Sequence, residues 1–215
     1  MVRRITSFLL LAVVLASVAG APPTAAIGEG GDPWPYVQME YRDIDVHWRS
    51  VFEGAGFGYA SPSLAVISEP TATPCGDASP VVGQTFYCAR NTTIYYAGGD
   101  LAGDWYVGDF AVTFTIAHEW AHHLQRLVYD ASAFTGDDSS VLFFELQADC
   151  LAGSYGNALT ASGVVEPGDI EEALAIALVI GDPVLADGQT HGSPEERVDA
   201  YMDGFNTGSC RTFGW

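Results

Sequence analysis

The segment from His118 to His122 constrains this chain more than any other, because it places two histidines four residues apart with Glu119 beside the first. In a helix of about 3.6 residues per turn, positions i and i+4 lie on one face, so both imidazoles can bind one metal ion. Glu119 lies about 100° round the same helix, where its carboxylate can reach a water molecule held by the metal more easily than the metal itself. The spacing predicts a zinc site with a separate base.

The residues around this motif predict that it lies on a helix. Apolar side chains recur at intervals of three and four residues, which is the pattern of a helix packed along one side; they are Phe110, Phe114, Ala117, Ala121, Leu124 and Val128. The chain has five histidines, and three of them fall between residues 118 and 123, which favours a metal site over a chance match. His123 should point away from the metal face and pack within the protein.

A catalytic zinc needs a third protein ligand and an open position for water. Residues 139–158 predict a mostly apolar helix in which Glu145 and Asp149 share one face. Burying a lone carboxylate is costly unless it meets a cation or hydrogen-bond donors, and a nearby metal would remove that cost. We assign Glu145 as the third ligand and Asp149 as the acceptor that fixes the tautomer of a ligating histidine, preferably His118. The reverse assignment of these two acids stays open.

Three sequence blocks, in this order, resemble the putative neutral zinc metallopeptidase family of bacterial, gluzincin-like proteins: HEWAHHLQ (118–125), ELQADCLAG (145–153) and THGSPEER (190–197). Shorter matches extend the resemblance over most of the chain from about Tyr36 onward. The resemblance implies a zincin-like domain with Zn²⁺ as cofactor, His118, His122 and Glu145 as ligands, and Glu119 as catalytic acid and base. Ala121 stands where the family has glycine, and residues 89–100 lack the acid expected after the IYY segment, so the shape of the substrate cleft stays open.

The expected chemistry is hydrolysis of a peptide bond. Zinc lowers the pKa of a bound water molecule toward about 7, and Glu119 would take its proton and return it to the leaving amine. His191, in the glycine-flanked segment 187–193, is a candidate second donor to the oxyanion, with a surface-loop histidine as the alternative. Arg197 either pairs with a buried carboxylate near the site or is solvated. Both of these choices stay open.

The N-terminus predicts export. Arg3 and Arg4 precede an uncharged apolar run over residues 5–18, followed by small residues, so residues 1–26 are interpreted as a signal peptide. The run is short for a membrane span of about 20 residues, which favours cleavage over a retained anchor, with no membrane insertion afterwards. We expect residues 27–35 to form a flexible linker and residues 36–215 the zinc metallopeptidase domain. The predicted location is secreted, extracellular or in the cell envelope.

Four cysteines in an exported protein predict disulfides, and three pairings are possible. We favour Cys75 with Cys88, which closes a short loop, and Cys150 with Cys210, which ties the predicted ligand helix to the C-terminal tail. A zinc site made of these thiols is less favoured, because the sequence has no C-x-x-C pair.

The charge of the chain limits its partners. There are 27 acids, 8 arginines and lysines together, and a formal net charge of −19. Such a surface argues against nucleic acid or an anionic membrane as a partner. We expect a protein or peptide substrate and a monomeric protein. Solubility is the favoured explanation of the acid excess, and cationic substrates and a high-salt habitat stay open as alternatives.

The patterns together predict a mostly helical α+β fold, a zincin-like metalloprotease domain with a small β-sheet. Helices are expected over residues 36–52, from Asp109 through the metal motif, and over residues 139–158, 169–180 and 194–205. Short strands are expected over residues 64–68 and 93–97, around a Pro- and Gly-rich loop that bears cysteines. The leading function is a secreted zinc metallopeptidase. The alternatives are a cell-wall peptide amidase and a catalytically idle zinc-binding surface domain, which would have no need of Glu119.

Overall fold

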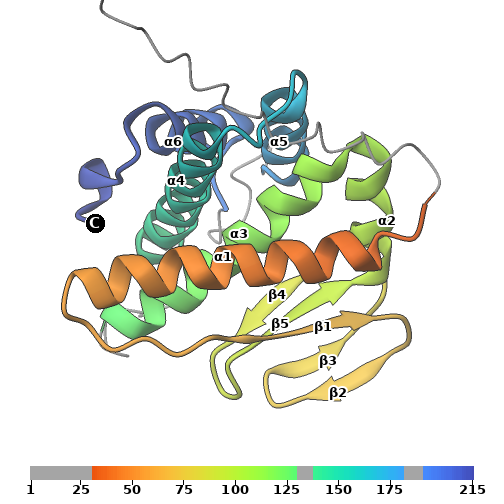
Figure 1. Cartoon of the computed structure of the whole chain (residues 1–215). Helices are drawn as coiled ribbons and strands as arrows, with labels where there is room; N and C mark the ends of the chain where they lie inside the picture. The colour runs from red at the N-terminus through yellow and green to blue at the C-terminus, as the bar shows by residue number, and fades with distance from the viewer. Residues whose placement is uncertain (1–30, 130–137, 182–190) are drawn as a thin grey trace, which may run out of the picture.

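The computed structural model describes residues 31–129, 138–181 and 191–215, so the predicted signal peptide lies outside it. Helices dominate the described residues and flank a small mixed sheet (Figure 1), which confirms the predicted mostly helical α+β class. The helices are α1 (Trp34–Gly54), α2 (Gly98–Val107), α3 (Asp109–Val128), α4 (Asp138–Ser162), α5 (Asp169–Ile180), α6 (Pro194–Thr207) and the short 3₁₀ helix η2 (Arg211–Phe213). The strands are β1 (Ser63–Ile67), β2 (Thr71–Thr73), β3 (Gly76–Ala78), β4 (Phe86–Cys88) and β5 (Thr93–Ala97).

The three-stranded sheet has the order β1-β5-β4, with β1 parallel and β4 antiparallel to the central strand. All five residues of β5 are buried, as expected for a strand covered on both faces. Strands β2 and β3 form a separate hairpin. Cys75, in the turn of that hairpin, forms a disulfide with Cys88 at the end of β4, the pairing favoured from the sequence. The disulfide therefore fixes the hairpin to an edge of the larger sheet.

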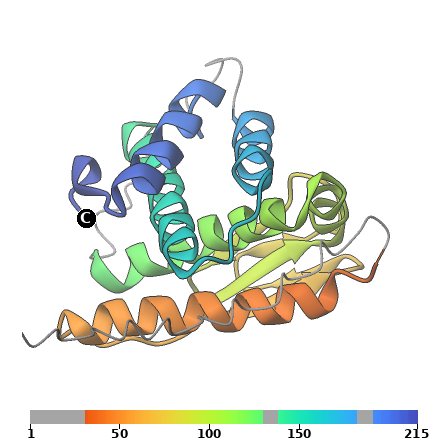
Figure 2. The same cartoon turned by 45° about the horizontal axis from the view of Figure 1, so that its top comes forward.

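Helix α3 occupies the centre of the molecule. It packs against α1, α2, α4, α5 and the strands β4 and β5, and in Figure 2 α4 and α5 lie on the side of α3 opposite α1. A helix surrounded in this way must be apolar on most of its surface, and Phe114, Ile116, Trp120 and Leu124 are all buried. The metal motif therefore lies on the most enclosed helix of the fold.

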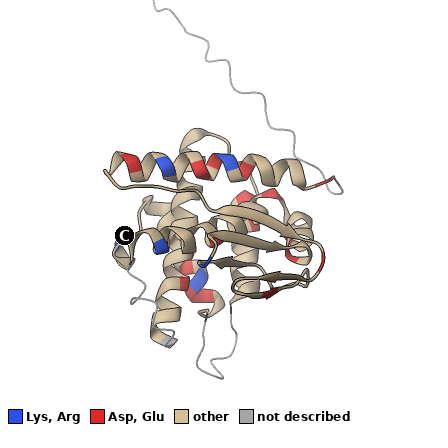
Figure 3. Cartoon of the chain, turned by 90° about the horizontal axis from the view of Figure 1, so that it is seen from below, with Lys and Arg blue, Asp and Glu red and all other residues tan. Residues whose placement is uncertain are grey.

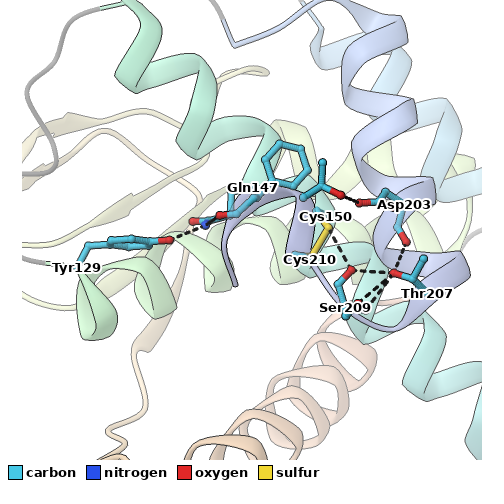
Figure 4. Close-up of a disulfide and its surroundings, with 9 residues drawn as sticks. Tyr129, Gln147, Cys150, Asp203, Thr207, Ser209 and Cys210 are labelled. Atoms are coloured by element: carbon cyan, nitrogen blue, oxygen red, sulfur yellow. Dashed lines mark hydrogen bonds between the residues drawn. A yellow bond between two sulfur atoms is a disulfide. The ribbon is translucent and has the colours of Figure 1, made fainter.

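Helices α4 and α6 approach each other so closely that two glycines are required at their crossing. A Cβ atom on Gly153 would lie 1.9 Å from the backbone oxygen of Tyr201, and one on Gly204 would lie 1.9 Å from that of Cys150. The Cys150–Cys210 disulfide, also the pairing favoured from the sequence, ties the C-terminal tail to α4 (Figure 4). α6 is thus held against the helix that carries Glu145 and Asp149.

Several elements differ from the sequence-based expectations. α1 begins at Trp34, so helix covers the last two residues of the segment predicted as a linker over 27–35. Helix α2 and strands β2, β3 and β4 were not expected. α2 opens with Gly98 and Gly99, which are poor helix formers, and a carboxylate in its first turn, Asp100, accepts hydrogen bonds from the backbone of residues 83–85. None of the described helices is both long and apolar enough to cross a membrane.

Candidate metal centre

Helices α3 and α4 bring the three predicted ligands together. His118 and His122 lie one turn apart on α3, and their Nε2 atoms are 3.2 Å from each other. The Glu145 carboxylate on α4 faces both rings, with Oε2 3.3 Å from His118 Nε2 and Oε1 3.4 Å from His122 Nε2. The structure therefore brings two imidazole nitrogens and the two oxygens of one carboxylate together in one small region.

The spacing of these donor atoms fits a zinc ion. Zinc binds histidine nitrogen and carboxylate oxygen at about 2.0–2.2 Å, so two ligands at a tetrahedral angle are roughly 3.3–3.5 Å apart. The three separations of 3.2, 3.3 and 3.4 Å are close to this value. Two histidines and one glutamate form the donor set of hydrolytic zinc sites that keep a fourth position for water. The residues present therefore fit the metal that the sequence predicts.

Each of the two candidate ligand histidines has a partner for its other ring nitrogen. Asp149, fully buried one turn after Glu145, places Oδ1 2.8 Å from His118 Nδ1. Gln125 places Oε1 3.0 Å from His122 Nδ1, while its Nε2 donates to the backbone oxygen of Phe144. Such partners fix the tautomer in which Nε2 keeps its lone pair for a metal. Sequence reasoning anticipated Asp149 but missed Gln125, whose signal was its position three residues after His122 on the same helical face.

The charges of the site couple the histidines to the acids. Burial alone would lower the pKa of His118, but Asp149 and Glu145 raise that pKa to about 10. Burial would raise the pKa of Glu145, yet His122 and His118 hold it well below its usual range. Protons on the imidazoles and a metal ion are therefore alternative partners for the same carboxylates, and zinc binding must compete with protons.

Glu119 is buried, yet one of its oxygens is unsatisfied. The residue is 8% exposed, and Oε2 has no hydrogen-bond partner among the described residues. Glu119 is not part of the group formed by the three donors. A buried carboxylate oxygen without a donor is costly unless a water molecule or substrate completes it. The arrangement leaves Glu119 available as a proton acceptor rather than a ligand.

His191, in the segment before α6, and Arg197, on α6, both lie beside Glu145. The His191 side chain is half exposed and its Nδ1 lies 3.5 Å from Glu145 Oε2, a contact that raises the pKa of His191. Arg197 is buried, and its Nη2 donates to Asp149 Oδ1 at 2.8 Å. Of the two interpretations left open for Arg197, pairing with a buried carboxylate is therefore confirmed and the solvated arginine is wrong. α6 begins at a capping box formed by Ser193 and Glu196.

His123 has the packing role expected from its position. Its Nε2 lies 2.6 Å from the backbone oxygen of Ala60, which can only accept, so this nitrogen carries the hydrogen. Nδ1 then accepts from the Tyr87 hydroxyl at 3.0 Å. Because Tyr87 lies on β4, His123 connects the edge strand of the sheet to the helix of the metal site.

Comparison with known proteins agrees with this geometry. A model of the family described as putative neutral zinc metallopeptidase matches residues 30–213. The uncharacterized protein YpfJ of Escherichia coli strain K12 is 35% identical over 196 aligned residues, which cover 78% of this chain and 67% of the relative. The uncharacterized protein Rv2575 of Mycobacterium tuberculosis strain H37Rv is 30% identical over 224 aligned residues, covering 86% and 73%. No solved structure matches the chain. The chain therefore belongs to the putative neutral zinc metallopeptidase family.

Proposed function

We propose that this protein is a secreted zinc-dependent metallopeptidase that hydrolyses peptide bonds with Glu119 as general base. The observation that carries the proposal is the convergence of His118, His122 and Glu145 at separations of 3.2–3.4 Å, with the buried Glu119 carboxylate on the same helix. A purely structural zinc site needs four protein ligands and no adjacent base. Three donors with a neighbouring carboxylate fit catalysis better.

Bound zinc would supply Lewis-acid polarisation and a lowered pKa for a water molecule at the open position. The chain supplies the proton transfers. Glu119 takes the proton of the attacking water on its Oε2 atom and later returns it to the nitrogen of the leaving amine. Oε2 accepts no hydrogen bond from the described residues, so no existing bond has to break for it to take the proton. Asp149 and Gln125 keep the Nδ1 hydrogens of the two histidines in place throughout, so the Nε2 lone pairs stay directed at one point.

His191 is proposed as a hydrogen-bond donor to the carbonyl oxygen as that oxygen gains negative charge. Its half-exposed ring beside Glu145 supports this role, because it lies next to the ligands and is open to a substrate. His191→Ala should then lower kcat by roughly 10²–10³-fold, the usual cost of losing one such donor, at unchanged zinc content. An unchanged kcat would remove His191 from the mechanism.

The substrate is proposed to be a protein or peptide outside the cytoplasm. The apolar leader over residues 1–26 and two disulfides support export, since disulfides persist in oxidising compartments. The net charge of −19 disfavours nucleic acid, and acidic segments outnumber basic ones along the described chain (Figure 3). We propose a monomer without stable membrane insertion. Gel filtration of the purified protein and fractionation of the producing cells test these two points.

The decisive experiment incubates the purified protein with casein and, separately, with isolated cell walls, with and without a chelator. The matched control is Glu119→Gln, which keeps all three zinc ligands and nearly the same volume. We expect casein cleavage that stops with chelator, returns with added zinc, and is absent in Glu119→Gln at equal zinc content. Cleavage of cell-wall peptides alone would identify the amidase instead. A zinc-loaded protein that cleaves neither substrate would identify the idle binding domain.

A further inference from the structure

Arg197 connects α6, which carries none of the three proposed ligands, to the metal centre. It is only 1% exposed, and its guanidinium contacts acceptors on α4 and in the segment before α6. Nη2 lies 2.8 Å from Asp149 Oδ1, whereas Nη1 lies 3.3 Å from the backbone oxygen of His191 and 3.6 Å from Glu145 Oε2. The planar fork of the guanidinium is suited to hold several acceptors in fixed relative positions.

The contacts of Arg197 determine how His118 is oriented. Asp149 Oδ1 accepts from Arg197 Nη2 and from His118 Nδ1, both at 2.8 Å. The two nitrogens are 3.3 Å apart, because both donate to the same oxygen. Asp149 itself is fully buried, and its Oδ2 has no partner among the described residues. The position of the Asp149 carboxylate beside His118 therefore depends heavily on its contact with Arg197.

We propose that Arg197 is a positioning residue of the metal centre, which holds Asp149 against His118 and the backbone of His191 beside Glu145. The inference rests on the proposed zinc site, and it adds a structural role for α6. The close crossing of α4 and α6 at Gly153 and Gly204 sets the distance across which Arg197 reaches Asp149. Arg197 thus links the packing of two helices to the orientation of a ligand on a third.

Positioning and simple charge predict opposite effects on zinc affinity. Arg197 places a cation 3.6 Å from an oxygen of a metal ligand, so by charge alone its removal should strengthen zinc binding. If Arg197 instead orients Asp149, its loss leaves a buried carboxylate without its cationic donor, and His118 loses its fixed tautomer. Loss of such an outer contact typically weakens metal affinity about 10–100-fold.

The test measures zinc affinity by competition with a chromophoric chelator and the visible spectrum of the Co²⁺-loaded protein, using the whole chain. Arg197→Lys keeps the charge but loses the planar fork, and Arg197→Met removes the charge at similar volume. Ser193→Ala is the control, because it removes the hydroxyl that caps α6 at Glu196 N without touching Asp149. We expect about 10–100-fold weaker zinc binding and an altered cobalt spectrum in both Arg197 variants, with neither change in Ser193→Ala.

Tighter zinc binding in Arg197→Met with unchanged binding in Arg197→Lys would overturn the proposal in favour of a charge effect. An equal loss in Ser193→Ala would reduce Arg197 to a stabiliser of α6. If Arg197→Met does not fold, Arg197→Lys decides the question. A wild-type protein that binds zinc but cleaves no peptide overturns the peptidase and leaves the positioning role standing, whereas one that binds no zinc overturns both.

Discussion

The buried acid Glu40, which lies outside the group of candidate metal ligands, should make the stability of this protein depend on pH. Glu40 lies on α1, is 3% exposed, and its Oε1 has no hydrogen-bond partner among the described residues. Burial raises the pKa of Glu40 from 4.5 to about 7, and Asp43 and Asp109 add to the rise. The folded protein therefore holds this carboxyl in its neutral form at pH values where the unfolded chain has lost the proton.

The sign and size of the effect follow from the two pKa values. Below about pH 4.5 the group is neutral in both states, and between 4.5 and about 7 only the folded state retains the proton. Stability from this group is thus greatest at low pH and is lost as the pH rises toward 7. At about 1.4 kcal/mol per pKa unit, the full loss is about 3 kcal/mol, most of it between pH 5 and pH 8.

Glu40→Gln removes the titration at nearly constant volume. Relative to wild type, its free energy of unfolding should increase by about 2–3 kcal/mol more at pH 8 than at pH 5. Urea denaturation at the two pH values measures this difference, with saturating zinc throughout so that other titrating groups contribute equally. Glu53→Gln, an exposed position on the same helix, should show no such change. If the gap between wild type and Glu40→Gln is equal at both pH values, Glu40 is not held neutral and the reasoning fails.

Three further predictions concern the frame around the site. The Cys150–Cys210 disulfide spans 60 residues and the Cys75–Cys88 disulfide spans 13. Replacing both cysteines of the first by alanine should lower the free energy of unfolding, measured by urea denaturation, by about 4 kcal/mol, and the same change in the second should lower it by about 3 kcal/mol. A larger loss for the shorter loop would contradict the chain-entropy reasoning. Gly153→Ala should lower the melting temperature strongly, because its Cβ would meet the backbone of α6 at 1.9 Å, whereas Gly103→Ala on α2 has open space and should be neutral or stabilising. Free zinc at about 100 times its dissociation constant should add about 2.7 kcal/mol to the free energy of unfolding relative to the chelator-treated protein, and equal melting temperatures in the two conditions would argue against a metal centre.

Part of the candidate metal centre could be predicted from the sequence because two of its relationships lie within single helices. The contact of Glu145 with the histidines joins α4 to α3, and it was expected only from the burial cost of a lone acid and from the family resemblance. Helical periodicity alone places His118 with His122, and Glu145 with Asp149, on shared faces. The same local reasoning could not identify the partner of Arg197, which is 48 residues from Asp149 and meets it only through the crossing of α4 and α6. Contacts of that kind depend on the distance between two helices, and the spacing of residues within one helix does not predict that distance.

The unexpected elements were missed for a different physical reason. Strands of three residues, such as β4, are too short to show an alternating pattern, and they exist because β5 offers a partner and the Cys75–Cys88 disulfide fixes the chain beside it. α2 begins with two glycines against its intrinsic preference. There the tertiary contacts of Asp100 with the loop at residues 83–85 outweigh propensity.

The residues that contact the Nδ1 atoms of His118 and His122 differ in charge, and this difference sets the net charge of the site. Asp149 is an acid paired with Arg197, whereas the corresponding partner of His122 is the neutral amide of Gln125. With neutral imidazoles on the two candidate ligands, the formal charges of Glu119, Glu145, Asp149 and Arg197 sum to two negative charges, before any proton on the half-exposed His191 beside Glu145 is counted. The divalent cation of the proposed zinc site would balance these two charges. A second acid in place of Gln125 would leave a net negative charge in a buried region, which is costly. The pairing of one acid with one amide therefore suits a doubly charged ion, and it explains why removing the metal should affect stability as well as chemistry.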